Sequence, residues 1–139
     1  VLNANYLRHK IIEEAKEKGV SDLFCDGAPV DVAKHEFTLS LAPMKEKMGI
    51  GAMDVAKGLL DKGYMAPTVY FPLVVPECMM IEPTETESKD TLDEFAKKFV
   101  EVLQEDADTL HNAPVTTKVR RVDEVYAARN LTLSYQFSE

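Results

Sequence analysis

One segment of the chain carries an apolar stripe at helical spacing, and it constrains the fold more than any other. Ser88 is suited to cap a helix that begins there, and Asp90, Asp93 and Glu94 would face the positive end of its dipole. The spacing predicts an amphipathic helix over residues 88–103 with one buried face. That face consists of Leu92, Phe95, Ala96, Phe99, Val102 and Leu103.

Two other segments also predict helices. In residues 2–18, Leu7, Ile11 and Ala15 recur every four positions before Gly19. Residues 53–62 have apolar side chains at helical spacing, and Gly63 can take the left-handed conformation that ends a helix. Shorter helical turns are predicted at 106–111 and 123–128.

Three segments favour strands. Residues 35–41 alternate strictly, which places Phe37 and Leu39 on a buried face with His35 in the same phase. Residues 68–73 and 78–81 predict an antiparallel pair joined by a four-residue turn, with Pro72 arguing for an edge strand or a bulge. Residues 21–34 predict a loop with one short strand at 22–25, and residues 43–51 predict a second loop.

This order of elements contains too few strands for a β-sandwich and no long series of βαβ units. We therefore expect an α+β domain, a two-layer sandwich with a three- to four-stranded, mostly antiparallel sheet and helices 53–62 and 88–103 on one face. The chain is expected to form a single domain over 1–139. It would comprise a helix at 1–18, an α+β core at 35–112 and an extended tail at 113–139.

The charge balance excludes some classes of partner. The chain has 16 basic and 24 acidic residues among 139, a net charge of −8, so polyanions such as nucleic acid and anionic membranes are repelled on average. No apolar run is long enough to cross a bilayer, and no signal sequence is evident, so we expect a cytoplasmic protein. Cys25 and Cys78 have no partners at metal-ligand spacing, which predicts no metal site and two buried free thiols.

Two groups of residues and one histidine could carry chemistry, and each also has a structural interpretation. Residues 82–88 hold three carboxylates and three hydroxyls, which could serve acid–base or metal chemistry or could cap the following helix. Arg120 and Arg121 could clamp an anion or pin the tail to an acidic surface. His35 could transfer protons at a pocket rim or be a partly buried, hydrogen-bonded side chain. From composition and spacing alone, the function stays open.

Six short strings in the sequence carry more specific information than the chemical character of their residues does. In order they are VLNANYL (1–7), HEF (35–37), DVAKGLL (54–60), APTVYFPL (66–73), MIEPTETE (80–87) and VRRVDE (119–124). Together they closely resemble the carboxy-terminal part of the glycine dehydrogenase (decarboxylating) family. This is the P-protein of the glycine cleavage system, and the likeness is greatest to subunit 2 of its two-subunit form.

The resemblance implies a fold and a parent reaction. The family has the aspartate-aminotransferase fold, in which a small carboxy-terminal domain closes over a large domain that holds pyridoxal phosphate. Glycine forms a Schiff base with the cofactor and loses carbon dioxide, and the aminomethyl group passes to the lipoyl arm of the H-protein. The companion P-protein subunit 1, the lipoylated H-protein and glycine are the implied partners.

The resemblance also implies what this chain lacks. The Schiff-base lysine belongs to the large domain, so the chain is expected to be a carboxy-terminal fragment that binds no cofactor, has no catalytic residue and is inactive alone. It is expected to self-associate through apolar surface that the large domain would cover. Many members have His where this chain has Met65. The pocket-rim candidates are Asn3, Asn5, His35, Thr68, Glu82, Thr84 and Glu85.

One alternative comes from a different functional class. Small α+β sheets of this size often bind ligands or other proteins without doing chemistry. The chain could therefore be a non-enzymatic ligand-binding or protein-interaction module. Tight binding of a specific small ligand by the isolated chain would favour that alternative.

Overall fold

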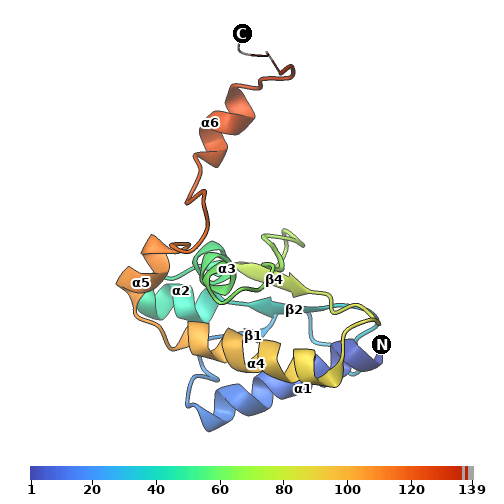
Figure 1. Cartoon of the computed structure of the whole chain (residues 1–139). Coiled ribbons are helices and arrows are strands. Elements are labelled where there is room, and N and C mark those ends of the chain that lie inside the picture. The colour runs from blue at the N-terminus through green and yellow to red at the C-terminus, as the bar shows by residue number, and fades with distance from the viewer. Residues whose placement is uncertain (136, 138–139) are drawn as a thin grey trace.

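The computed structural model describes residues 1–135 and 137, and it shows a four-stranded sheet packed with helices (Figure 1). This confirms the α+β class. In chain order the elements are α1 (Leu2–Glu17), β1 (Cys25–Asp26), β2 (Phe37–Ser40), α2 (Ala42–Met48), α3 (Ala52–Asp61), β3 (Thr68–Val69), β4 (Cys78–Ile81), α4 (Lys89–Leu103), α5 (Ala107–Asn112) and α6 (Glu124–Arg129).

The sheet is antiparallel throughout, with strand order β1-β2-β4-β3. Its centre is the β2–β4 pair, in which Phe37 lies opposite Ile81 and Ser40 opposite Cys78. The predicted pairing of the 68–73 and 78–81 segments is confirmed, although β3 has only two residues. Pro72 lies beyond β3, which is an edge strand, in agreement with its inability to donate to a ladder.

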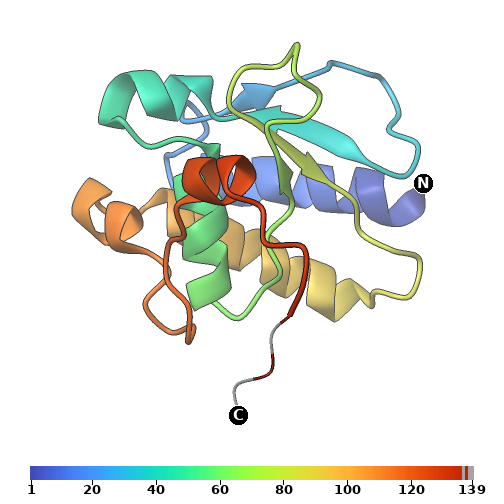
Figure 2. The same ribbon diagram turned by 90° about the horizontal axis from the view of Figure 1, so that it is seen from above.

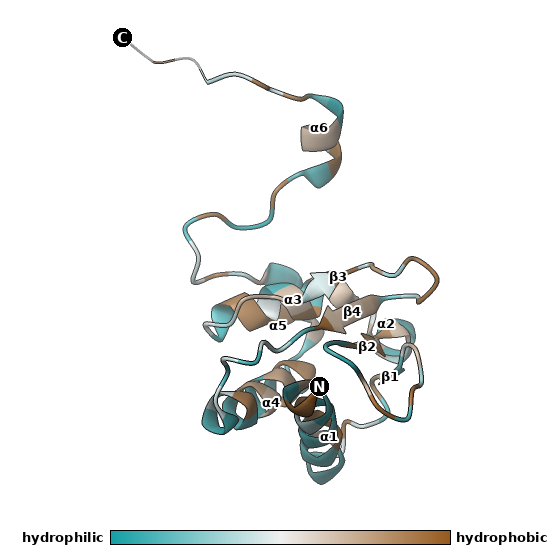
Figure 3. Ribbon diagram, turned by 90° about the vertical axis from the view of Figure 1, so that its right-hand side faces the viewer, coloured by the Kyte–Doolittle hydropathy of each residue, from teal (hydrophilic) through white to brown (hydrophobic). Residues whose placement is uncertain are grey.

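Two helices form the second layer. α1 and α4 lie side by side beneath the sheet (Figures 1 and 3). α3 packs on α4 and against β3, but it lies at the level of the sheet rather than beneath it. The view from above shows α1 running behind the strands, with α3 to one side of them (Figure 2).

The core lies between the sheet and these two helices. The predicted stripe of α4 is buried, apart from Phe95, which is partly exposed. The α4 stripe packs against α1, where Leu7, Ile11 and Ala15 are all buried as their spacing predicts. Figure 3 shows hydrophilic residues on the outer side of both helices, as amphipathic helices require.

Three local predictions were wrong. The expected loop at 43–51 begins with α2, whose only buried residue is Met44, so this short helix shows almost no periodic signal. Pro43 fits its first turn, where a missing N–H costs nothing. His35 lies outside β2 and is exposed, because the strand begins only at Phe37. Cys25 is exposed on the edge strand β1, whereas Cys78 is buried as expected.

The tail is attached to the domain over its first part only. The carboxylate of Asp61 accepts hydrogen bonds from the backbone N–H groups of Val115 and Thr116, at 2.8 Å each. From residue 122 onward the described side chains are exposed, and no residue of α6 is buried. α6 therefore stands away from the body of the domain (Figure 1). Of the tail predicted at 113–139, positions 136, 138 and 139 lie outside the described residues.

Candidate functional site

A groove lies where the N-terminal turn of α4 meets β3, β4 and the segment that joins α3 to β3. Its volume is about 410 Å³. The apolar lining includes Leu7, Met80, Leu92 and Phe95. The polar lining comes from Thr68, Glu82, Thr84, Glu87 and Thr91.

The turn at residues 82–88 forms one side of the groove, and its hydrogen bonds hold it in place. The Ser88 hydroxyl accepts the backbone N–H of Thr91 at 3.2 Å and so caps α4, which confirms the capping interpretation for this residue. The hydroxyls of Thr84 and Thr86 lie 2.8 Å apart and share a hydrogen bond. The polar residues of this turn are therefore structural in part.

Asn3 ties the start of α1 to this turn. Its side-chain amide donates to the backbone oxygens of Thr84 at 2.8 Å and Glu87 at 3.2 Å. One turn further along α1, the Tyr6 hydroxyl donates to Asp93 on α4. The first turns of α1 and α4 are thereby held together beside the groove.

The structure brings some of the seven pocket-rim candidates together and not others. Thr68, Glu82 and Thr84 line the groove, and Asn3 contacts its edge. The side chain of Asn5 instead binds both the N–H and the carbonyl of Ala33, so it holds the loop before β2. The remaining two candidates, His35 and Glu85, are exposed and do not line the groove.

Sequence reasoning identified Met65 only as a departure from the family resemblance and did not find Tyr64, and these two residues form the other side of the groove. Tyr64 and Met65 line it from the segment after α3. The Tyr64 ring packs edge-to-face on Phe95, with centroids 5.4 Å apart. Burial raises the pKa of the Tyr64 hydroxyl, and the nearby Glu94 carboxylate raises it further. The available sequence signal for Tyr64 and Met65 was that they lie directly between Gly63 and the string at 66–73.

The groove by itself does not fit a cofactor that is held through a Schiff base. Such a cofactor needs a lysine amine at the site, and none of the lining residues is a lysine. The nearest candidate by sequence, Lys89, pairs with Asp93 at 2.6 Å. Across residues 1–135 and 137, no cluster of His, Cys, Asp and Glu is arranged to hold a metal ion. What the groove offers is an apolar wall with a polar margin.

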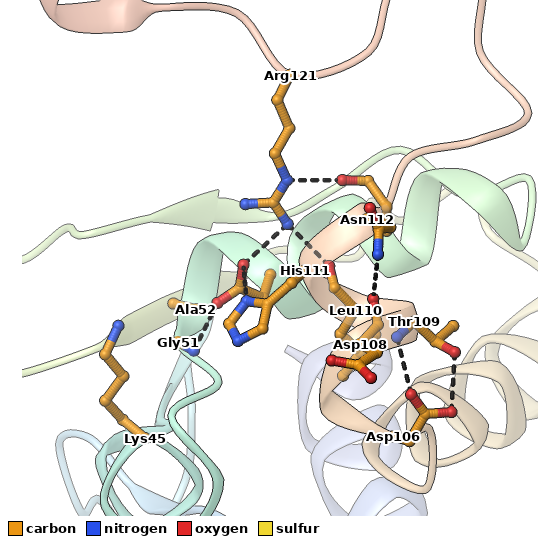
Figure 4. Close-up of polar contacts among 12 residues, drawn as sticks. Lys45, Gly51, Ala52, Asp106, Asp108, Thr109, Leu110, His111, Asn112 and Arg121 are labelled. Carbon is orange, nitrogen blue, oxygen red and sulfur yellow. Dashed lines mark hydrogen bonds and ion pairs between the residues drawn. The ribbon is translucent and has the colours of Figure 1, made fainter.

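A second polar cluster joins the tail to α3 (Figure 4). Arg121 donates to the carboxylate of Asp54 and to the backbone oxygens of Leu110 and Ala113, at 2.8 Å each. Asp54 also accepts the N–H of Gly51 at 2.9 Å, which caps α3. This arrangement confirms the pinning interpretation for Arg121, which clamps carbonyls and a buried carboxylate of its own chain.

The electrostatics of this cluster favour the ionised form of Asp54. Burial alone would raise the pKa of Asp54. The Gly51 N–H, the Arg121 guanidinium and His111, whose Nδ1 lies 3.6 Å away, together outweigh burial and hold that pKa below its usual value. The cluster is thus a charged anchor, in which Asp54 and Arg121 are paired with each other and with backbone groups.

No helix among the described residues is both long enough and apolar enough to cross a membrane.

Comparison with known proteins identifies relatives along nearly the whole chain. The protein family described as the C-terminal domain of glycine dehydrogenase matches residues 1–124. "Probable glycine dehydrogenase (decarboxylating) subunit 2" of Nitrosospira multiformis is 50% identical over 97% of this chain and 26% of its own length. The proteins of the same name from Thermosipho melanesiensis and Exiguobacterium sibiricum are 46% and 49% identical, over 100% and 98% of this chain and 27% and 26% of their own lengths.

The chain therefore spans about a quarter of the length of the curated relatives it matches. The family match covers α1 to the start of α6 and includes every residue of the groove. The names of these relatives, which include the words "subunit 2", imply that those proteins act with a companion subunit. By the match over residues 1–124, this chain belongs to the family of glycine dehydrogenase C-terminal domains.

Proposed function

We propose that this domain is the carboxy-terminal small domain of a pyridoxal-phosphate-dependent glycine dehydrogenase. In this proposal the enzyme decarboxylates glycine and passes the aminomethyl group to the lipoyl arm of the H-protein. The match to the family and to the subunit 2 relatives supports the assignment. Because the chain spans about a quarter of those relatives, the cofactor would be held by a part of the protein outside this chain.

One observation carries the proposal to a particular site. The strings at 66–73 and 80–87, which bear the family resemblance, come from separate parts of the sequence, and both contribute to the lining of one groove. Ile81 of the second string is buried in the core, whereas Thr68, Glu82 and Glu87 are exposed. Residues with a shared location and little burial point to a role in function rather than in packing.

The groove would act as a wall that closes the active site. Its apolar residues would exclude water from the reacting carbon, which strengthens every charge interaction on the facing side. Thr68, Glu82 and Thr84 would supply hydrogen bonds at the margin. The Asn3 contacts would keep the turn at 82–88 in register with α1, so Asn3 is a positioning residue in this scheme.

A groove-filling substitution in the whole enzyme tests this function. Thr68→Trp puts an indole into the groove from an exposed position, so the fold should survive. In subunit 2 assembled with its companion and the H-protein, we expect kcat/KM for glycine-dependent carbon dioxide release to fall at least about tenfold, roughly 1.4 kcal/mol. The unfolding midpoint should stay the same.

The matched control is Val32→Trp, which adds the same indole to an exposed residue that does not line the groove. It should leave kcat/KM unchanged. If Thr68→Trp has the activity of the control, the groove is not part of the active-site wall and this proposal fails.

A further inference from the structure

The loop between β3 and β4 presents an apolar tip to solvent. Leu73 and Val74 are 87% and 89% exposed, and the aromatic rings of Tyr70 and Phe71 beside them are about half exposed. Monomeric proteins rarely leave large apolar side chains together on one projection unless another molecule covers them. Residues 70–75 are therefore a candidate contact site.

This loop is held rigidly by hydrogen bonds at both ends. The N–H of Tyr70 donates to the carbonyl of Cys78 at 2.9 Å, and the Cys78 thiol donates to the carbonyl of Phe71 at 3.0 Å. Val75 N–H closes the tip by donating to the carbonyl of Pro72 at 3.0 Å. A tip fixed in this way loses little conformational entropy when it docks, which favours binding.

The backbone conformation also indicates that the loop is held in place by its surroundings. Tyr70 and Glu77, which flank the tip, have φ of 60° and 46°, a left-handed conformation that is unfavourable for a non-glycine residue. Glu77 is fixed by contacts with the domain, because its carboxylate accepts the N–H of Ala52 at 2.8 Å. Such conformations are found where a particular presentation of side chains is needed.

The end of the tail is a second apolar projection. After Arg121 the chain leaves the domain, and Leu131, Leu133, Tyr135 and Phe137 are all strongly exposed. In the sequence these four residues alternate with polar ones, Thr132, Ser134 and Gln136. An alternation of period two is the pattern of a strand with one buried face. The sequence of residues 131–137 thus has the pattern of a strand with one buried face.

The sheet of this domain offers that segment no suitable edge. The two edge strands, β1 and β3, have two residues each, and both longer strands are already paired on both sides. A strand of the length that the alternation predicts needs a longer edge. An acceptor for such a strand would therefore have to lie outside this sheet.

The loop and the tail project on the same side of the domain. Both rise from the face of the sheet opposite α1 and α4 (Figures 1 and 3). The groove instead adjoins the start of α1, where the preceding part of the subunit 2 relatives would join a C-terminal domain. The groove and the two projections thus lie on different sides of the domain and could contact different neighbours.

The charges favour a protein partner over a membrane. Residues 70–77 contain no lysine or arginine, and residues 122–137 contain one basic residue, Arg129, against two acidic ones. Binding to an anionic bilayer needs clustered basic residues beside the apolar ones. Exposed aromatic and aliphatic anchors with few charges are instead typical of the centre of a protein interface.

We infer that the loop at 70–75 and the tail at 122–135 together bind the companion subunit of the glycine dehydrogenase. The loop inserts its apolar tip into a pocket of that subunit, and residues 131–135 add a strand to one of its sheet edges. This inference rests on the proposed function, because the companion is the second subunit that the names of the relatives imply.

Association of whole subunit 2 with its companion tests the inference, with the dissociation constant measured by sedimentation or titration. Leu73→Ser/Val74→Ser alters only exposed side chains of the loop, and Leu131→Ser/Leu133→Ser does the same in the tail. Each double variant should weaken binding at least about tenfold, because buried apolar anchors dominate interface free energies. Val32→Ser, an equivalent change on the loop before β2, should leave the dissociation constant unchanged.

The outcomes separate this inference from the proposed function. If both double variants bind the companion as tightly as the unaltered subunit does, the inference is wrong while the proposed function stands. Loss of self-association alone, with companion binding intact, also contradicts it and assigns the surface to a second copy. If the unaltered subunit does not bind the companion at all, the proposed two-subunit function itself fails.

Discussion

The guanidinium of Arg121 lies 2.8 Å from the carboxylate of Asp54, and this contact joins the tail to the first turn of α3. The same guanidinium reaches two backbone oxygens at the end of α5, so one side chain links three segments. The anchor stands at the base of the projecting tail and fixes where that tail leaves the domain.

Removing this anchor should destabilise the domain. Arg121→Ala leaves the buried carboxylate of Asp54 without its nearest cation and takes donors from two carbonyls. We expect the free energy of unfolding to fall by about 1–3 kcal/mol. Urea unfolding followed by circular dichroism measures the change. The control is Arg129→Ala on the exposed helix α6, which should change stability by no more than about 0.5 kcal/mol; equal effects would show that the anchor is not structural.

The contribution of Asp54 should depend on pH. Burial opposes its ionisation, but the Gly51 N–H and Arg121 hold its folded pKa below the unfolded value of about 3.9. A depressed pKa gives stability that is present above the unfolded pKa and is lost as pH falls through the folded one. Asp54→Asn should therefore be destabilising near neutral pH, and its difference from the unaltered protein should shrink as pH falls below about 4.

Unfolding curves at several pH values check this behaviour. Asp31→Asn, which removes an exposed carboxylate from the loop before β2, is the control and should show little difference at any pH. A destabilisation by Asp54→Asn that stays constant down to pH of about 3 would show that charge is not what the carboxylate contributes.

Truncation of α1 in the core should be costly. Ile11 is fully buried where α1 packs on α4. Ile11→Ala should lower the free energy of unfolding by about 2–5 kcal/mol, because it removes buried methyl groups and leaves a cavity. Leu2→Ala, at an exposed position of the same helix, should cost under about 0.5 kcal/mol. Similar losses from both changes would mean that α1 does not belong to the core of this domain.

The two thiols should differ strongly in reactivity. Cys25 is exposed, whereas Cys78 is buried and burial raises the pKa of its thiol. Since the thiolate is the reactive species, a thiol reagent at mildly alkaline pH should modify one cysteine quickly and the second only after unfolding. Cys25→Ser should abolish the fast phase. A fast phase that survives this change would place Cys78 at the surface.

Long periodic elements were predictable from the sequence, and short ones were not. The α4 stripe and the spacing of Leu7, Ile11 and Ala15 predicted α4 and α1 correctly, because each burial pattern repeats over several turns. α2 buries only Met44 and leaves no repeat to detect. His35 continued the strand alternation by chance, and only the structure shows that the strand begins at Phe37.

The groove was predictable only in part. The family strings identified Thr68, Glu82 and Thr84, which the fold brings together. Tyr64 could not be found in this way, and Met65 stood out only as a departure from the family resemblance, because the position of both residues depends on how the chain after α3 turns toward β3. Asn5 also lies in a family string and was a pocket-rim candidate. Its side chain instead holds the loop at Ala33, a contact between residues 28 positions apart. Such long-range contacts leave no periodic signal in the sequence.

Glycine-dependent carbon dioxide release is the most direct test of the central claim, that this domain works only as part of a larger enzyme. The isolated chain, supplied with pyridoxal phosphate, glycine and lipoylated H-protein, should release no carbon dioxide and should not shift the absorbance of the cofactor. Whole subunit 2 with its companion subunit should do both under the same conditions. Turnover by the isolated chain would contradict the account, since it would place the catalytic apparatus within these 139 residues.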